Sequence, residues 1–302
     1  MAKSVNIVEV GPRDGLQNER EVVATPDKVE LISRMIAAGA RRIEVASFVH
    51  PTRVPQMADA EAVIAALPDN PDVSYIGLVL NKRGVLRALA TREGNKRGVD
   101  EVGCVIVASD TFGQKNQGQT IAQGLAENSE MIRFAKSEGM IAQVTISAAF
   151  GCPFEGRVPA QTVVDIARRM AEAEPAEIAL ADTIGVGVPA QVTDLFGAVR
   201  EAVPSHIALR AHFHDTRNTG IANAWAAYQA GVETLDASLG GLGGCPFAPN
   251  ATGNIATEDL LNLLDRSGVD SGIDLDAAIA VNRWFAAVLG RQLPSLVAKA
   301  AG

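Results

Sequence analysis

Residues 207–216 read Ile-Ala-Leu-Arg-Ala-His-Phe-His-Asp-Thr, an apolar run that ends in two histidines separated by one residue. The run predicts a strand over Ile207–His212, and side chains alternate between the faces of a strand, so His212 and His214 should point the same way. The chain has only four histidines. Imidazoles on one face of a strand end, joined by oxygen ligands from elsewhere, are typical of a divalent-metal site. The alternative interpretation is a pair of hydrogen-bonded residues at a strand end.

Similar apolar or β-branched runs recur along the chain, with helical patterns between them. Their starts are spaced by roughly 30 residues, the length of one βα unit of a barrel. One helix is predicted from Thr25, with Pro26 at its first turn, to a stop at Gly39, and others over Ala160–Ala173 and Ala222–Ala230. The eight predicted strands are Val5–Val10, Arg42–Ser47, Ser74–Val79, Glu101–Val107, Met140–Ser147, Ala176–Ala181, Ile207–His212 and Glu233–Ser238.

This repetition predicts an α/β fold, a (β/α)8 TIM barrel. Eight units need about 250 residues, and the pattern fills the chain to about position 240. An open doubly wound sheet is the alternative, but no GxGxxG follows the first strand. Helices predicted over Thr257–Leu264, Leu275–Leu289 and Leu293–Ala300 should pack beside the barrel. We therefore expect one catalytic domain over residues 1–302, with the barrel at about 1–240 and a glycine-rich active-site loop and C-terminal helices at about 241–302.

Composition excludes several classes of protein. The 302 residues are 47% hydrophobic and 21% charged, which is ordinary for a globular chain. A net charge of −8 argues against a nucleic-acid partner. No apolar stretch approaches the roughly 20 residues needed to cross a bilayer, and no signal-peptide core is seen, so we expect a cytoplasmic protein without a membrane partner. Three widely spaced cysteines provide neither a disulfide framework nor a CxxC site.

Residues that can bind a metal follow several of the predicted strands. In a TIM barrel the active site lies at the carboxyl ends of the strands, so Asp14, His212, His214 and Asn254 should converge on one face. Two oxygen and two nitrogen donors suit a six-coordinate Mg²⁺, Mn²⁺ or Co²⁺ better than zinc, because no thiolate is required. Taken alone, Asp14 and Asn254 would each be ordinary turn residues.

The chain resembles a known family at five places. Residues 8–19 (Val-Glu-Val-Gly-Pro-Arg-Asp-Gly-Leu-Gln-Asn-Glu) closely resemble the opening of the 3-hydroxy-3-methylglutaryl-CoA (HMG-CoA) lyases. The resemblance spans almost the whole chain in register. Arg13-Asp14 and His212-x-His214 are shared with a wider superfamily of metal-dependent lyases, acyl-CoA condensing enzymes and carboxyltransferases, whereas Gly-Leu-Gly-Gly-Cys-Pro is more specific to the lyases. The other matching segments are 54–57, 151–156, 182–187 and 242–259.

The resemblance implies a metal-dependent retro-Claisen cleavage of HMG-CoA to acetyl-CoA and acetoacetate. It implies an acyl-CoA thioester substrate, a divalent cation (Mg²⁺ or Mn²⁺, with Co²⁺ as an alternative) and a homodimer. By analogy the ligands are Asp14, His212, His214 and Asn254. The cation would acidify the 3-hydroxyl group of the substrate as a Lewis acid.

The resemblance also implies catalytic roles. Arg13 would stabilise negative charge on the thioester oxygen, and Cys245, after a run of glycines, would deliver a proton to C2. Glu44 and Asp182 would orient Arg13, the metal ligands or the substrate, although each could equally cap a helix. Cys152 occupies a similar Gly-Cys-Pro-Phe quartet without the preceding glycines, so cysteine in this quartet need not be catalytic.

The chain departs from the lyase pattern in two loops. The lyases read Ser-Pro-Lys-Trp where this chain has His50-Pro-Thr-Arg53, and Tyr-Gly-Gln where it has Arg217-Asn218-Thr219. With Gln17, the residues His50, Arg53 and Arg217 are candidate substrate-binding residues, or else solvated loop residues. A different 3-hydroxyacyl-CoA, citramalyl-like or methylmalyl-like, is therefore an alternative substrate. A condensing synthase and a non-catalytic metal-binding barrel are the remaining alternatives.

Overall fold

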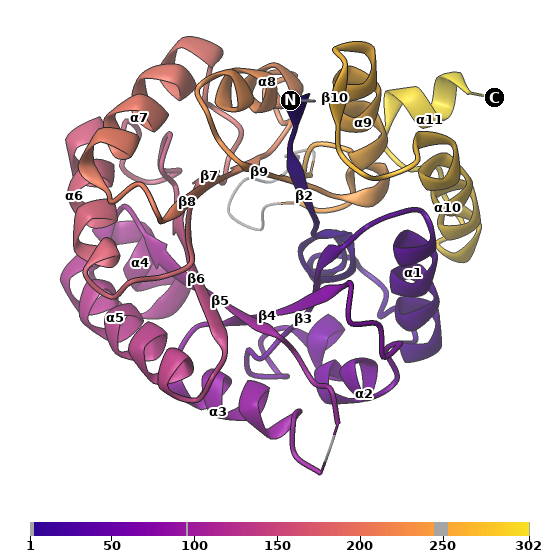
Figure 1. The fold of residues 1–302 in the computed structure, drawn as a ribbon, viewed down its shortest axis with the longest axis horizontal. Helices are drawn as coiled ribbons and strands as arrows, with labels where there is room; N and C mark the ends of the chain where they lie inside the picture. The colour runs from indigo at the N-terminus through magenta and orange to yellow at the C-terminus, as the bar shows by residue number, and fades with distance from the viewer. Residues whose placement is uncertain (1–2, 95, 245–252, 302) are drawn as a thin grey trace.

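The computed structural model describes residues 3–94, 96–244 and 253–301, and these form a closed barrel of eight parallel strands. Each barrel strand pairs with the next one along the chain, and β9 closes the ring against β2 (Figure 1). The predicted (β/α)8 fold is confirmed. The barrel strands are β2 (Asn6–Glu9), β3 (Arg42–Ser47), β4 (Ser74–Val79), β5 (Glu101–Val107), β6 (Ile141–Ser147), β7 (Glu177–Asp182), β8 (Ala208–Phe213) and β9 (Thr234–Ala237).

Every predicted strand overlaps one of these, and the first ends early for a local reason. Val10 has φ −104° and ψ 1°, so it leaves the extended conformation and starts a turn. The strand β2 therefore stops at Glu9.

Helices surround the barrel and cover its outer surface (Figure 1). Their inner faces are apolar at helical spacing, as in α6, where Val163, Ala167 and Met170 are buried. The helices that alternate with the strands are α1 (Thr25–Ala37), α2 (Ala60–Ala65), α3 (Lys82–Ala90), α4 (Asp110–Gln117), α5 (Ile121–Ser137), α6 (Ala160–Ala171), α7 (Pro189–Ala202) and α8 (Gly220–Gln229).

The C-terminal helices α9 (Thr257–Arg266), α10 (Leu275–Val288) and α11 (Leu296–Ala300) pack together beside the barrel, as predicted, with α10 against α1 and α9 against α8 (Figure 1). The last helix begins later than predicted, because the side chain of Ser295 accepts a hydrogen bond from the N–H of Ala298 and caps it there. A short parallel pair, β1 (Lys3–Ser4) with β10 (Val269–Asp270), ties the start of the chain to this region.

Among the described residues, no helix combines the length and apolar character that a transmembrane span requires.

The interior of the barrel is filled in layers by alternate strands. The layer at the amino ends contains the first residues of β3, β5, β7 and β9, which are Arg42, Glu101, Glu177 and Thr234. Arg42 pairs with Glu101 at 2.7 Å and with Glu177 at 3.0 Å, and the hydroxyl of Thr234 donates to Glu177 at 2.7 Å. Branched apolar residues usually fill such a layer. Here it is ionic.

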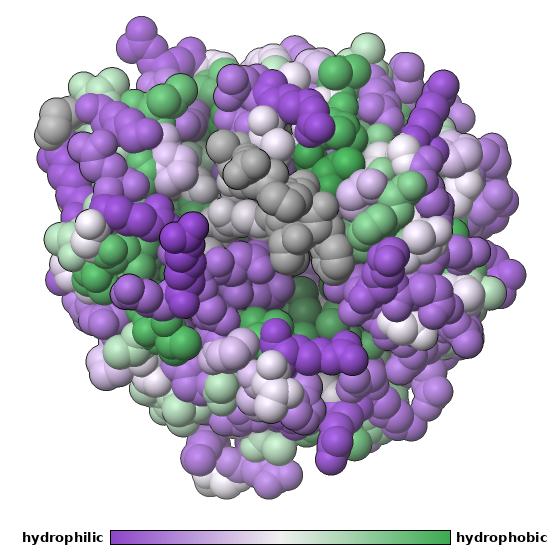
Figure 2. Space-filling model, turned by 180° about the vertical axis from the view of Figure 1, so that it is seen from behind, coloured by the Kyte–Doolittle hydropathy of each residue, from purple (hydrophilic) through white to green (hydrophobic). Residues whose placement is uncertain are grey.

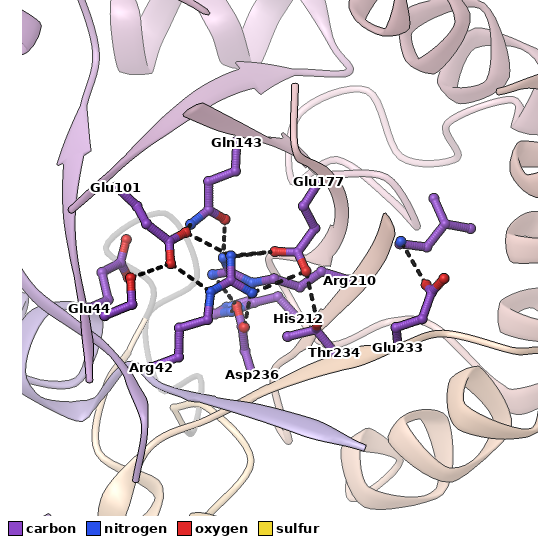
Figure 3. Close-up of polar contacts among 12 residues, drawn as sticks. Arg42, Glu44, Glu101, Gln143, Glu177, Arg210, His212, Glu233, Thr234 and Asp236 are labelled. Carbon is purple, nitrogen blue, oxygen red and sulfur yellow. Dashed lines mark hydrogen bonds and ion pairs between the residues drawn. The ribbon is translucent and has the colours of Figure 1, made fainter. Parts of the chain in front are cut away.

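Two further polar residues continue this layer toward the carboxyl ends of the strands. Gln143 of β6 donates to Glu101 at 3.0 Å, and Arg210 of β8 donates to the side-chain oxygen of Gln143 and lies 3.7 Å from Glu177 (Figure 3). We call Arg42, Glu101, Gln143, Glu177 and Arg210 the ionic belt.

Candidate functional site

The first barrel strand ends in a tight turn that carries two charged residues in succession. Residues Gly11–Gly15 form a π-helical turn, η1, in which the N–H of Asp14 donates to the carbonyl of Val10 at 2.8 Å. A Cβ atom on Gly15 would lie 2.9 Å from the Cβ of Leu242, so only glycine lets the turn pack against the chain that follows β9. Single π-turns occur frequently at functional sites.

The two histidines lie at the end of β8 as the alternation predicts. Their ring centres are 5.2 Å apart. His212 lies within β8, and His214 follows it and forms an antiparallel bridge with Asn254. Both imidazoles therefore occupy the carboxyl end of the same strand.

A short extended segment after residue 252 brings Asn254 to the histidines. The carbonyl of Gly253 accepts from the N–H of Asp215 at 3.1 Å, and the N–H of Ile255 donates to Phe213 at 3.1 Å. The side chain of Asn254 donates to Asp14 at 2.8 Å and to the carbonyl of Leu242 at 3.0 Å. Distant parts of the chain thus meet at the carboxylate of Asp14.

These side chains fit a divalent cation. One ligand atom from each of Asp14, His212 and His214 lies within 4.8 Å of the others. Nδ1 of His214 and Oδ1 of Asn254 are buried and have no hydrogen-bond partner among the described residues. Buried polar atoms are normally paired, and a cation bound beside the carboxylate of Asp14 would satisfy both of these atoms. The donor set, oxygen with imidazole nitrogen, is one that Mg²⁺, Mn²⁺ or Co²⁺ accepts.

Local charges put two of these groups in the protonation states that bind metals. Burial alone would raise the pKa of Asp14, but the charges of Arg13, His212 and His214 hold that pKa well below its usual range. Burial, with the neighbouring charge of His212, lowers the pKa of His214 to about 4. Near neutral pH, Asp14 is therefore an anion and His214 a neutral base.

Arg13 is buried directly beside this cluster. One Nη atom lies 2.6 Å from Asp14, the other lies 2.5 Å from Glu44, and Nε is buried without a partner among the described residues. Burial raises the pKa of Glu44, although Arg13 opposes that shift. The contact with Glu44 is compatible with the orienting role predicted for it from the sequence, which stays a prediction.

Asp182, at the end of β7, organises the turn that follows its strand. Its carboxylate accepts the N–H groups of Val186 at 3.0 Å and Gly187 at 2.8 Å. Arg217, from the loop after β8, donates to the carbonyls of Ile184 at 2.9 Å and Gly185 at 3.0 Å in the same turn. The two loops are therefore joined on the active-site face.

The other candidate substrate-binding residues lie farther toward solvent or next to Arg13. The side chain of Gln17 accepts from Arg13 at 3.4 Å. His50 is exposed and lies 2.8 Å from the hydroxyl of Thr52, and Arg53 is exposed. Figure 2, seen from behind relative to Figure 1, shows a hollow near the middle of that face with hydrophobic residues inside it and hydrophilic ones around it.

Of the three cysteines, Cys245 lies outside the described residues. Cys152 is buried, 3.0 Å from the hydroxyl of Ser109, and its sulfur accepts the N–H groups of Phe154 and Glu155 at 3.4 Å. These contacts hold a turn together. Cys104 lies in β5, where burial raises the pKa of its thiol to about 12.

One contact of the site was not anticipated from the sequence. Asp236 of β9 accepts from Nδ1 of His212 at 2.9 Å and pairs with Arg210 at 2.6 Å (Figure 3). The available signal was a charge at an inward position of the apolar strand β9 (Thr-Leu-Asp-Ala).

Comparison with known proteins identifies the family of this chain. Residues 4–284 match the family model described as HMGL-like. The chain belongs to this family. One HMGL-like relative is (R)-citramalyl-CoA lyase of Chloroflexus aurantiacus, 45% identical over 99% of this chain and 95% of the relative. Another is the hydroxymethylglutaryl-CoA lyase of Pseudomonas mevalonii, 41% identical over 95% of this chain and 93% of the relative.

A solved HMGL-like structure has the same fold. It is an HMG-CoA lyase from Acinetobacter baumannii in complex with coenzyme A and 3-methylmalate, with a TM-score of 0.91, 39% identity, and coverage of 98% of this chain and 95% of that one. The family predicted from the sequence is therefore confirmed. Its relatives are carbon–carbon lyases of CoA thioesters, but they differ in the acyl group that their names give.

Proposed function

We propose that this chain is a divalent-metal-dependent carbon–carbon lyase that cleaves a 3-hydroxyacyl-CoA into acetyl-CoA and a keto acid. The observation that carries this proposal is the buried Arg13, paired with Asp14 beside two histidines whose ligand atoms lie within 4.8 Å of that carboxylate. A metal site next to a permanent cation suits a reaction in which negative charge develops on a thioester oxygen. Membership of the HMGL-like family supports the same reaction.

Asp14, His212, His214 and Asn254 would hold the cation. When bound, the cation would act as a Lewis acid that makes the 3-hydroxyl group of the substrate easier to deprotonate. The anionic Asp14 and the neutral His214 are in the protonation states that this requires.

Arg13 would bind the thioester oxygen as negative charge develops there. Asp14 and Glu44 hold its two Nη atoms, which fixes the plane of the guanidinium group. Its buried Nε is a donor without a partner among the described residues, and its donation to the thioester oxygen would satisfy it.

Cys245 remains our candidate for the acid that protonates C2. The described start of the glycine-rich loop lies against the site, since a Cβ atom on Gly243 would be 2.7 Å from the side-chain nitrogen of Asn254. Cys245 follows two positions later in the chain. Cys152, which holds a turn, provides the matched comparison for mutagenesis.

For the acyl group, we propose a citramalyl-type thioester, with HMG-CoA as the second candidate. The 45% identity to a citramalyl-CoA lyase favours the first, and identities of about 40% to HMG-CoA lyases favour the second. Arg217 supplies a further argument. The carbonyls of Ile184 and Gly185 hold its cationic group on the turn that Asp182 organises. A cation held at this position would favour an acyl group whose carboxylate is placed differently from that of HMG-CoA.

The reaction class is tested by acetyl-CoA release from a panel of 3-hydroxyacyl-CoA thioesters. We expect chelator-treated protein to be inactive and Mg²⁺, Mn²⁺ or Co²⁺ to restore cleavage. Activity that persists in protein shown to be free of metal would overturn the metal assignment. If no thioester releases acetyl-CoA with any of these ions, the result favours the non-catalytic barrel. If the protein instead forms a thioester from acetyl-CoA and a keto acid in net synthesis, the result favours the condensing synthase.

The acyl preference is tested by measuring kcat/KM for citramalyl-CoA and HMG-CoA side by side. We expect a preference of roughly tenfold for citramalyl-CoA, the size of effect that one methylene group produces. Arg217→Tyr, which restores the lyase pattern, should move the preference toward HMG-CoA. A wide margin in favour of HMG-CoA in the unmodified protein would contradict the citramalyl assignment and leave the lyase class intact.

A further inference from the structure

His212 differs from His214 in having a carboxylate behind it. Oδ2 of Asp236 lies 2.9 Å from Nδ1 of His212. A carboxylate accepts hydrogen bonds, so Nδ1 carries a proton, and in the neutral ring the lone pair belongs to Nε2. Nε2 is the ring atom that faces the site, 3.9 Å from Oδ2 of Asp14. For His214, Nδ1 has no partner among the described residues.

Asp236 is itself held in place by a forked contact. Nε of Arg210 donates to its Oδ1 at 2.6 Å, and Nη2 donates to its Oδ2 at 2.9 Å. The two side chains are almost fully buried, with exposed fractions of 4% and 3%. A planar guanidinium that binds both oxygens fixes the plane of the carboxylate.

Arg210 is fixed in turn by the ionic belt. Its remaining Nη atom donates to Gln143 and lies 3.7 Å from Glu177 (Figure 3). Arg210 and His212 are two residues apart on β8, so both point into the barrel, and Asp236 of the adjacent β9 lies between them. The contacts form one continuous path from the amino ends of the strands to His212.

We propose that Asp236, clamped by Arg210, is a positioning residue that fixes His212 with Nε2 toward the metal and thereby strengthens metal binding. This rests on the metal site of the proposed function. Asp236 acts through His212, not on the substrate. Carboxylates that hold a metal-binding histidine in this way typically contribute 10–100-fold to metal affinity.

The test is the affinity of the chelator-treated protein for Mn²⁺ alone, measured by electron paramagnetic resonance or calorimetry. For Asp236→Asn we expect the Kd to rise by roughly 10–100-fold. Thr234→Val is the matched control, because it lies on the same strand and loses one buried hydrogen bond to Glu177 without touching His212. Its Kd should change by less than about threefold, which is well below the typical effect of an outer-shell partner. Equal Kd values for Asp236→Asn and the unmodified protein would overturn the proposal.

A second measurement needs no variant and covers the case in which Asp236→Asn does not fold. Nitrogen-15 histidine spectra of the unmodified, metal-free protein should show neutral His212 as the Nδ1–H tautomer. The Nε2–H tautomer at His212 would overturn the proposal. Neither readout depends on cleavage of a thioester, so failure of this inference and failure of the lyase assignment are separately visible.

Discussion

The two ends of the barrel interior use the same residue types in opposite states. In the ionic belt at the amino ends, Arg42 donates to both Glu101 and Glu177, and no belt atom is among the buried polar atoms without a partner in the described chain. Near the carboxyl ends, Nε of Arg13, Nδ1 of His214 and Oδ1 of Asn254 are buried and have no partner within residues 3–94, 96–244 and 253–301. A satisfied network fixes the structure, whereas unpaired groups are available to a ligand.

The difference indicates which end carries stability and which carries chemistry. In TIM barrels generally, the carboxyl face holds the active site and the amino face contributes to stability. Here the chemical composition of the two ends is alike, since both contain buried arginine and carboxylate. Hydrogen-bond satisfaction, and not residue type, distinguishes them.

The largest loss of stability is expected from a substitution in the ionic belt. Arg42→Met should lower the free energy of unfolding by on the order of 3 kcal/mol, because it removes the cation that pairs with the buried Glu101 and Glu177 and leaves only Arg210, 3.7 Å from Glu177. Urea unfolding measures this. For the variant that stays folded, kcat should remain within about threefold, since Arg42 touches none of the proposed metal ligands and Arg210 keeps its forked contact with Asp236.

Arg41→Met is the matched control, because the neighbouring Arg41 donates to the backbone carbonyls of Ile36 and Ala40 and has no carboxylate partner in the described chain. Its unfolding free energy should change by less than about 1 kcal/mol, as for most surface substitutions. A large drop in kcat with little loss of stability in Arg42→Met would contradict the assignment of stability to the amino ends of the strands and of chemistry to their carboxyl ends.

At the other end, Arg13→Lys should mainly lower activity. Lysine keeps the charge but cannot reach Asp14 and Glu44 with a planar fork and still present a third donor, so kcat should fall about 10²–10³-fold. Steady-state kinetics with saturating Mg²⁺ and thioester measure it, together with the thermal unfolding midpoint, which should change little. Arg34→Lys, on the surface of α1, should match the unmodified protein. A kcat within tenfold of the unmodified value would remove Arg13 from the charge-stabilising role.

Much of this arrangement could be predicted from the sequence, for reasons visible in particular residues. The spacing of the strands predicts the barrel, since largely apolar runs such as Glu101–Val107 recur at regular intervals along the chain. Alternation placed His212 and His214 on one face, and the rule that active sites follow strand ends brought Asp14 to them. The same rule brought Asn254 to them from beyond the last strand, and the family resemblance added its assignment as a ligand, although its own sequence context is that of a turn.

The ionic belt and Asp236 could not be predicted in the same way. Charges at Glu101, Glu177 and Arg210 are visible within apolar strands, but which of them meet depends on how adjacent strands are staggered around the barrel. The contact between His212 and Asp236 joins positions 24 residues apart, and only the register of β8 against β9 sets it. Likewise, sequence alone could not decide that Arg217 would dock on carbonyls while His50 would be exposed.

The last expected effect is spread over several pH units and concerns carboxylates that lack an arginine partner. Glu9 at the end of β2 accepts the N–H of Leu239 at 2.9 Å, and Glu258 in α9 accepts the N–H of Gly240 at 2.9 Å and the amide of Asn282 at 2.7 Å. Burial raises the pKa of both carboxyl groups to about 7. The belt provides the contrast, because hydrogen bonds from Arg42, opposing the effect of burial, lower the pKa of Glu101.

The sign of the resulting pH dependence follows from proton counting. Between about pH 4.5 and 7 the folded protein binds more protons at Glu258 than the unfolded chain does, so stability falls as pH rises through this window. In Glu258→Gln that contribution disappears. We expect the unfolding free energy of the variant, relative to the unmodified protein, to rise by up to about 3 kcal/mol from pH 5 to pH 8, at about 1.4 kcal/mol for each unit of pKa shift. Urea unfolding at four pH values measures this, with Glu30→Gln on the exposed face of α1 as the control for removal of a carboxylate.

Because Glu9 keeps its own raised pKa, part of the fall in stability should remain in the variant. If the unfolding free energy depends on pH in the same way in the variant and in the unmodified protein, the hydrogen-bond donors around Glu258 compensate for the missing arginine. The two ends of the barrel would then differ in which buried polar atoms are paired, but not in the charge state of their carboxyl groups.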